Sequence, residues 1–180
     1  MTVLIFPDNT VLINFALINR MDLLGRLANG NGRWCATIAA ECAESAKRPE
    51  LAALQGAAEI LGEPLFPEAA ELQDAQVLRD QLAGPGDLKT THLGEAETIA
   101  IVTRRRFNCF FVTDDKDATR LATYNGVTVV STWHLLHMAH RAGLLDADAL
   151  WGYVLTIEGH GRKIPPGVWN RESFDKWLSA

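Results

Sequence analysis

Acidic residues stand where this sequence should end an apolar strand or begin a helix. Asp8 follows the apolar run VLIF, and Asp114 and Asp115 follow the run CFFV. Glu41 and Glu95 lie in segments with helical spacing. If such carboxylates met, each pair would repel by about 4 kcal/mol at about 4 Å and an effective dielectric near 20. A divalent cation would offset that repulsion, so the set predicts a metal site.

Carboxylate oxygens are the ligands that Mg²⁺ and Mn²⁺ prefer. An ion of this kind polarises phosphoryl oxygens and activates water, which is the chemistry of phosphodiester hydrolysis. The predicted metal ligands are Asp8, Glu95, Asp114 and Asp115. Glu97 is the alternative to Glu95, because two residues two positions apart on a helix do not share one face. Glu95 is preferred because it lies at the helix start, after a glycine.

The segments around these residues alternate between strand and helix patterns, which predicts an α/β fold with a parallel sheet. Predicted strands cover residues 2–6, 109–113 and 127–130. Predicted helices cover residues 10–18, 36–47, 49–61, 68–82, 94–106, 118–124, 132–143, 147–155 and 173–178. Ligands bind beyond the carboxyl ends of such strands. The acids that follow the first two strands should therefore meet at one edge of the sheet.

Composition narrows the class of protein. A chain of 180 residues that is 48% hydrophobic can bury the core of one domain. The net charge of −5 argues against a surface for non-specific nucleic-acid binding, but not against a nucleic-acid enzyme. The three cysteines lack C-x-x-C spacing and are expected to be buried free thiols. With no leader pattern and no apolar stretch of roughly 20 residues, we expect a cytoplasmic protein.

Cationic residues near the predicted site are candidates for RNA contact. Arg162 and Lys163 lie in a Gly/Pro-rich loop over residues 159–167, and Lys116 and Arg120 follow the last acids. The arginines at 104–106 end a helix, where the helix dipole alone favours cations.

Histidines at 134, 137 and 140 raise the question of a zinc site. Their spacing of three spreads the rings over about 120° of a helix, which is too wide for one shared ion. Zinc is therefore a weak alternative to the carboxylate site.

Four segments in order, LIFPDNTVLIN, ATIAAE, LGEAETIAIV and FVTDDKDATRLA, resemble the PIN-domain ribonuclease family, most closely its VapC-type, toxin-like branch. The resemblance covers residues 2 to about 145. It implies a three-layer α/β/α sandwich with a mostly parallel sheet, an acidic Mg²⁺ or Mn²⁺ site, and endoribonuclease activity restrained by a cognate antitoxin protein. It also implies a homodimer, for which the apolar faces of residues 10–18 and 50–61 are candidates.

The resemblance carries the catalytic roles of four acids to Asp8, Glu41, Glu95 and Asp115. The supporting polar positions are Thr10, Asn14, Glu97, Thr113, Asp114 and Asp117. The third acid is Glu in G-E-A-E where the commoner pattern has Asp, which keeps Glu97 open. The chain is also longer between the second and third acids, over residues 48–91. Residues 1–145 are expected to form the nuclease domain and 146–180 an extension packed on it.

Simpler roles exist for the same acids. Asp8 and the acids at 114–117 could be helix caps and nothing more, and Glu41 could be an ordinary solvated side chain. A non-catalytic PIN-like module for RNA binding or scaffolding is then the alternative function, distinguished by absent Mg²⁺ or Mn²⁺ affinity. A phosphatase of the haloacid dehalogenase class is less favoured. In its nucleophile loop a second Asp stands where this chain has Thr10.

Overall fold

A three-stranded parallel sheet lies at the centre of the computed structural model, which describes residues 2–180. Its strands are β1 (Leu4–Pro7), β2 (Cys109–Val112) and β3 (Thr128–Val130), in the order β1-β2-β3. β2 pairs with both neighbours in parallel register, with Phe111 opposite Phe6 and Val129. All three carboxyl ends therefore point to one edge, and the residues after each strand meet there.

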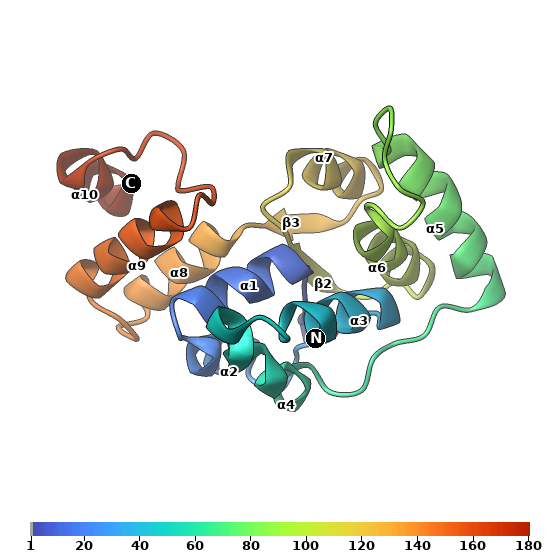
Figure 1. The fold of residues 1–180 in the computed structure, drawn as a ribbon, viewed down its shortest axis with the longest axis horizontal. Coiled ribbons are helices and arrows are strands. Elements are labelled where there is room, and N and C mark those ends of the chain that lie inside the picture. The colour runs from blue at the N-terminus through green and yellow to red at the C-terminus, as the bar shows by residue number, and fades with distance from the viewer. Residues whose placement is uncertain (1) are drawn as a thin grey trace.

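Successive strand residues point to opposite faces and so divide the core in two. Ile5 and Val112 belong to one apolar cluster, whereas Phe6 and Phe111 belong to the other. Each cluster is completed by a layer of helices, and Figure 1 shows α1, α8 and α9 on one side of the strands and α5 and α6 on the other. The predicted three-layer α/β/α sandwich with a parallel sheet is confirmed.

The first layer contains helices from both ends of the chain. They are α1 (Asn9–Leu17), α2 (Met21–Ala28), α3 (Ala36–Ser45), the 3₁₀ helix η1 (Pro49–Gly56), α4 (Ala57–Leu61), α8 (Thr132–Arg141), α9 (Ala147–Gly159) and α10 (Arg171–Ser179). The second layer consists of α5 (Ala69–Leu82), α6 (Leu93–Arg104) and α7 (Lys116–Tyr124). The long segment between α3 and α6 therefore supplies helices to both layers.

The structure adds one helix that was not predicted and divides one that was. α2 was not predicted, because its eight residues contain Gly25 and its N-cap, Arg20, makes no side-chain capping bond. Residues 49–61 form a 3₁₀ helix followed by a short α-helix, where one continuous helix was predicted. The change falls at Gly56, a residue that costs a helix interior roughly 1 kcal/mol relative to Ala.

The C-terminal segment shares the core of the first layer. Leu150, Val154, Ile157 and Phe174 are fully buried in the same apolar cluster as α1 and α8. The indole N–H of Trp133 in α8 donates to the carbonyl of Lys163 at 3.2 Å, which fixes the loop between α9 and α10. Figure 1 shows α10 at the opposite end of the molecule from α5.

The surfaces proposed for dimerisation are not available. Val11 to Ala16 in α1, and Leu51, Leu54, Ala57 and Leu61 in the following helices, lie inside the protein's own core. The prediction that residues 10–18 and 50–61 supply a dimer interface is wrong, because both segments have partners within the chain. Within residues 2–180, none of the helices combines the length and apolar character needed to span a membrane.

Candidate functional site

Asp8 is a buried carboxyl at the point where β1 meets α1. Its Oδ1 accepts the backbone N–H of Val11 at 2.7 Å, which caps α1, and its Oδ2 accepts the hydroxyl of Thr113 at 2.6 Å. Only 1% of the residue is exposed. Capping and a place at the sheet edge are therefore compatible, because each oxygen of Asp8 has a different partner.

Thr113 joins the ends of the first two strands. Its hydroxyl donates to Asp8 and accepts the backbone N–H of Asp115 at 3.1 Å. The Oδ1 of Asp115 accepts the N–H groups of Asp117 and Ala118 at 2.9 and 2.8 Å, so Asp115 is the N-cap of α7. Asp8 and Asp115 thus lie on either side of one hydroxyl, as the parallel sheet predicts.

Asp114 occupies a more elaborate polar network than the sequence indicated. Its Oδ1 accepts the backbone N–H of Thr132 at 2.9 Å, and its Oδ2 accepts the Thr132 hydroxyl at 2.6 Å and the Asn14 amide at 2.8 Å. Thr132 is fully buried at the start of α8. Sequence analysis missed this residue, although its position two residues after the end of β3 was a signal that a third strand end reaches the same edge.

Glu41 and Glu95 come from α3 and α6, which approach closely at Gly94. A Cβ on Gly94 would lie 2.4 Å from Ile38 Cδ1 and 3.3 Å from Glu41 Oε1. The glycine therefore lets the start of α6 approach α3 beside Glu41. Glu95 lines the pocket described below.

Glu97 is buried elsewhere on the same helix. Its two oxygens accept the backbone N–H of Thr37 at 3.1 Å and the Thr37 hydroxyl at 2.7 Å. Glu97 therefore ties α6 to the first turn of α3 and does not line the pocket, whereas Glu95 does. Thr37 was also missed, because an isolated Thr near a helix start gives no distinguishing signal.

Burial disfavours the ionised forms of two of the acids, Asp8 and Glu41. Burial raises the pKa of Asp8 to about 7, and the charges of Glu95 and Asp114 add to that rise, against the lowering effect of the bonds from Thr113 and Val11. Burial also raises the pKa of Glu41 to about 7, with contributions from Glu95 and Glu97. Carboxyls with strongly perturbed pKa values cluster at functional sites.

A pocket of about 260 Å³ opens beside this edge of the sheet. Its lining combines acids, amides and cations: Thr10, Asn14, Glu95, Asp114, Asp115, Gly161, Arg162 and Lys163. Residues from α1, α6, the β2–α7 turn and the α9–α10 loop therefore converge on one space.

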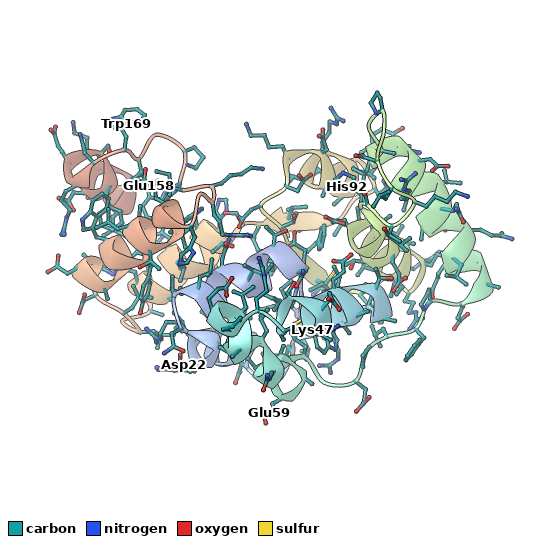
Figure 2. The ribbon with its side chains drawn as sticks, viewed as in Figure 1. Asp22, Lys47, Glu59, His92, Glu158 and Trp169 are labelled. Atoms are coloured by element: carbon teal, nitrogen blue, oxygen red, sulfur yellow. The ribbon has the colours of Figure 1, made fainter. Side chains whose placement is uncertain are left out.

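Figure 2 shows His92 at the start of α6, where its imidazole lies 3.9 Å from Glu95 and 3.9 Å from Asp87.

The four candidate RNA-contacting cations fall in different environments. Arg162 and Lys163 line the pocket. Arg120 forms an ion pair with Asp117 at 3.0 Å on the exposed side of α7, so neither residue points into the pocket as a free charge. Lys116 is exposed at the start of the same helix.

The three histidines of α8 each have a partner other than a metal. His134 contacts Ser131 in the capping box, His137 contacts the Leu178 carbonyl at 3.1 Å, and His140 contacts the Leu145 carbonyl at 3.1 Å. These contacts give the histidines structural roles in holding α8 to its surroundings.

The donor chemistry of the site fits a hard divalent cation. Among residues 2–180, no three His, Cys, Asp or Glu side chains are arranged to hold one ion. Mg²⁺, however, is usually held by one or two carboxylates together with water and substrate phosphate. The carboxylates that line the pocket, Glu95, Asp114 and Asp115, are oxygen ligands of the kind that this cation takes.

Comparison with known proteins agrees with this geometry. A protein-family model described as a PIN domain matches residues 4–171, which includes the sheet, the acids and the cationic loop. No curated protein and no solved structure matched the chain. Because the family match extends over most of the sequence, and the fold is the sandwich expected for it, the chain belongs to the PIN-domain family.

Proposed function

We propose that this protein is a metal-dependent endoribonuclease that hydrolyses RNA phosphodiester bonds at the acidic pocket. The observation that carries the proposal is that Glu95, Asp114 and Asp115 line one pocket. Asp8 is joined to Asp115 through the Thr113 hydroxyl, and Glu41 lies beside Gly94 at the start of α6, although neither Asp8 nor Glu41 lines the pocket itself. PIN domains are generally nucleases, and family membership makes this chemistry the best fit to the site.

One or two of the carboxylates of Asp8, Glu95, Asp114 and Asp115, together with water and the substrate phosphate, would hold Mg²⁺ or Mn²⁺. When bound, the cation would supply Lewis acidity toward the phosphate and acidify a water. The chain's own contribution is orientation: Thr113, Thr132 and Asn14 fix the oxygens of Asp8 and Asp114 before substrate arrives. Burial raises the pKa of Glu41 to about 7, which would suit this carboxyl to accept a proton from the attacking water.

A toxin role and its partners belong to the same proposal. The resemblance to the VapC-type branch supports a function as the toxin of a toxin-antitoxin pair, restrained by an antitoxin and acting as a homodimer in the cytoplasm. A small gene adjacent to this one, whose product co-purifies with the protein and suppresses its nuclease activity, would support that role.

The decisive experiment compares two aspartates that both cap helices. Asp115 caps α7, and Asp146 caps α9 by accepting the Ala149 N–H at 2.7 Å, outside the pocket. Because Asn caps a helix as well as Asp does, neither Asp115→Asn nor Asp146→Asn should unfold the protein. We expect Asp115→Asn to slow cleavage by about 100-fold or more, on the scale of a lost electrostatic contact to a transition state. Asp146→Asn should cut at the wild-type rate.

Cleavage is measured on a circular single-stranded RNA with Mg²⁺ or Mn²⁺, because only an endonuclease can open a circle. Wild-type rates in Asp115→Asn would remove Asp115 from the site. A wild-type protein that binds neither metal ion and leaves RNA intact would instead support the non-catalytic RNA-binding or scaffold module. A stable phosphoaspartate on Asp8 would instead support a phosphatase.

A further inference from the structure

Arg162 enters the acidic pocket from a part of the chain remote from the acids. It lies in the loop between α9 and α10, and its guanidinium reaches residues of α1 that line the same pocket. Nε donates to the side-chain oxygen of Asn14, and Nη2 donates to the carbonyl of Thr10 at 3.0 Å. Two directional bonds therefore fix the plane of the guanidinium.

The bonds of Arg162 leave its charge uncompensated by direct contact. Both acceptors are neutral oxygens, and no ion pair among residues 2–180 joins Arg162 to a carboxylate. Burial lowers the pKa of this guanidinium, whereas the nearby charges of Asp114 and Asp8 act in the opposite direction. A half-buried charge held by neutral groups is costly, and an anion bound in the pocket would offset that cost.

Asn14 couples the cation to the acids. Its carbonyl oxygen accepts from Arg162, and its amide donates to Asp114 at 2.8 Å and to Thr132 at 3.1 Å. One buried amide thus sets the distance between a cation and a carboxylate that face the same space. Lys163 stands at the rim as well, with its Nζ donating to the backbone carbonyl of Asp114 at 3.3 Å.

We propose that Arg162 contacts a phosphate of the RNA substrate, and that Asn14 and the Thr10 carbonyl hold it in position for that contact. The proposal rests on the nuclease function above and adds to it that the C-terminal segment supplies part of the substrate site. A guanidinium anchored through Nε and Nη2 keeps Nη1 for a phosphate oxygen, and a fixed donor loses little entropy on binding.

The test measures RNA binding separately from cleavage. A fluorescein-labelled single-stranded RNA is titrated with protein in the presence of a chelator, at several salt concentrations, and anisotropy reports the affinity. We expect Arg162→Gln to bind at least roughly tenfold more weakly, as for a lost hydrogen bond to a charged group. The slope of log affinity against log salt should fall by about 0.7, because one phosphate contact is lost.

Two matched variants separate this contact from general charge and from folding. Arg171→Gln removes the same charge from the same segment, but Arg171 pairs with Asp148 and Asp175 outside the pocket. It should change the affinity by less than about twofold, because Arg171 does not line the pocket and its charge is already paired with two exposed carboxylates. Arg162→Lys keeps the charge without the planar fork and should retain the wild-type salt slope at an intermediate affinity.

The proposal is wrong if Arg162→Gln has the affinity and salt slope of wild type while its melting temperature is unchanged. It is also wrong if Arg162→Gln binds RNA more tightly or cuts it faster, since Arg162 would then be an internal counter-ion that blocks the pocket. Failure of the nuclease function gives a different result: no cleavage by wild type, with RNA binding still dependent on Arg162.

Discussion

Asp8 combines two requirements that oppose each other in the metal-free protein. Hydrogen bonds from Thr113 and from the start of α1 hold its two oxygens in place. The same position is buried, and burial disfavours the ionised form of the carboxyl. The pKa of Asp8 is consequently raised from 3.8 to about 7. A bound cation should therefore stabilise the folded protein most above about pH 7, where Asp8 would otherwise be a buried charge without a counter-ion.

The raised pKa predicts how the stability of the metal-free protein depends on pH. The folded state holds the proton of Asp8 up to about pH 7, whereas the unfolded state releases it near 3.8. Asp8 therefore does not lower the free energy of unfolding below pH 3.8, the pKa of the unfolded state. Its destabilising effect grows as the pH rises and is complete once the pH passes about 7, the pKa of the folded state. We expect Asp8→Asn, measured with a chelator, to exceed the wild type in free energy of unfolding at pH 8 by about 1–3 kcal/mol.

Urea unfolding at pH 5 and at pH 8 measures this difference, which should be smaller at pH 5. Asp146→Asn serves as the control, because Asp146 caps α9 outside the pocket. A pH profile of Asp8→Asn parallel to that of wild type would mean that Asp8 ionises normally in the fold. Added Mn²⁺ should raise the melting temperature of wild type at pH 8 and have little effect on Asp8→Asn.

The α5–α6 pair shows why a run of three arginines is not by itself an RNA-binding surface. Arg105 binds both oxygens of the buried Glu71, with Nε and Nη2 at 2.8 and 2.7 Å. Arg104 pairs with Asp74 on the exposed side of the same two helices. Both arginines therefore form ion pairs that connect α6 to α5, and these pairs help to hold the second helix layer together.

Removing Arg105 should leave a buried carboxylate without its partner. We expect Arg105→Gln to lower the free energy of unfolding at pH 7 by about 2–4 kcal/mol, as for a broken buried ion pair. The guanidinium of Arg105 lowers the pKa of Glu71 below 4.5, so its stabilising effect is present above that value and lost as the pH falls through the lowered pKa. The effect of the substitution should accordingly shrink in acid.

Arg104→Gln is the matched control for the Arg105 prediction, because the Arg104–Asp74 pair is exposed and screened by water. Denaturant unfolding of both variants at pH 7 and below pH 4.5 makes the comparison. Equal effects of the two substitutions would contradict a special role for the Glu71 pair.

Patterns along the chain predicted the elements that hold the acids but not the elements that close the pocket. Apolar runs followed by Asp8 and by Asp114 predict β1, β2 and their shared edge, and the parallel pairing of these strands agrees. Thr132 and Thr37 escaped prediction, because a lone Thr beside a helix start is common and its partners lie far away in sequence. The cationic loop was recognised, yet its position over the pocket depends on how α9 and α10 pack.

The C-terminal segment and the rest of the PIN domain share one apolar interior. Phe174 is fully buried, and the centroid of its ring lies 5.2 Å from the ring centroid of Trp151 and 5.8 Å from that of Trp177. Trp169, by contrast, is 75% exposed at the outer side of the loop before α10, where Figure 2 shows it pointing away from the protein. Burial thus differs sharply between two aromatic residues five positions apart.

This difference predicts how residues 146–180 are coupled to the rest of the protein. Phe174→Ala should lower the free energy of unfolding by about 3–5 kcal/mol, since it leaves a cavity in the shared core. Trp169→Ala should have little effect on stability.

Because the interior is continuous, we expect one unfolding transition in which far-ultraviolet circular dichroism and tryptophan fluorescence coincide, in wild type and in Phe174→Ala alike. Two separate transitions, with only the first shifted by Phe174→Ala, would mean that residues 146–180 unfold as an independent unit. In that case Arg162 would leave the pocket before the acidic edge of the sheet is lost, and RNA affinity would fall at the first transition.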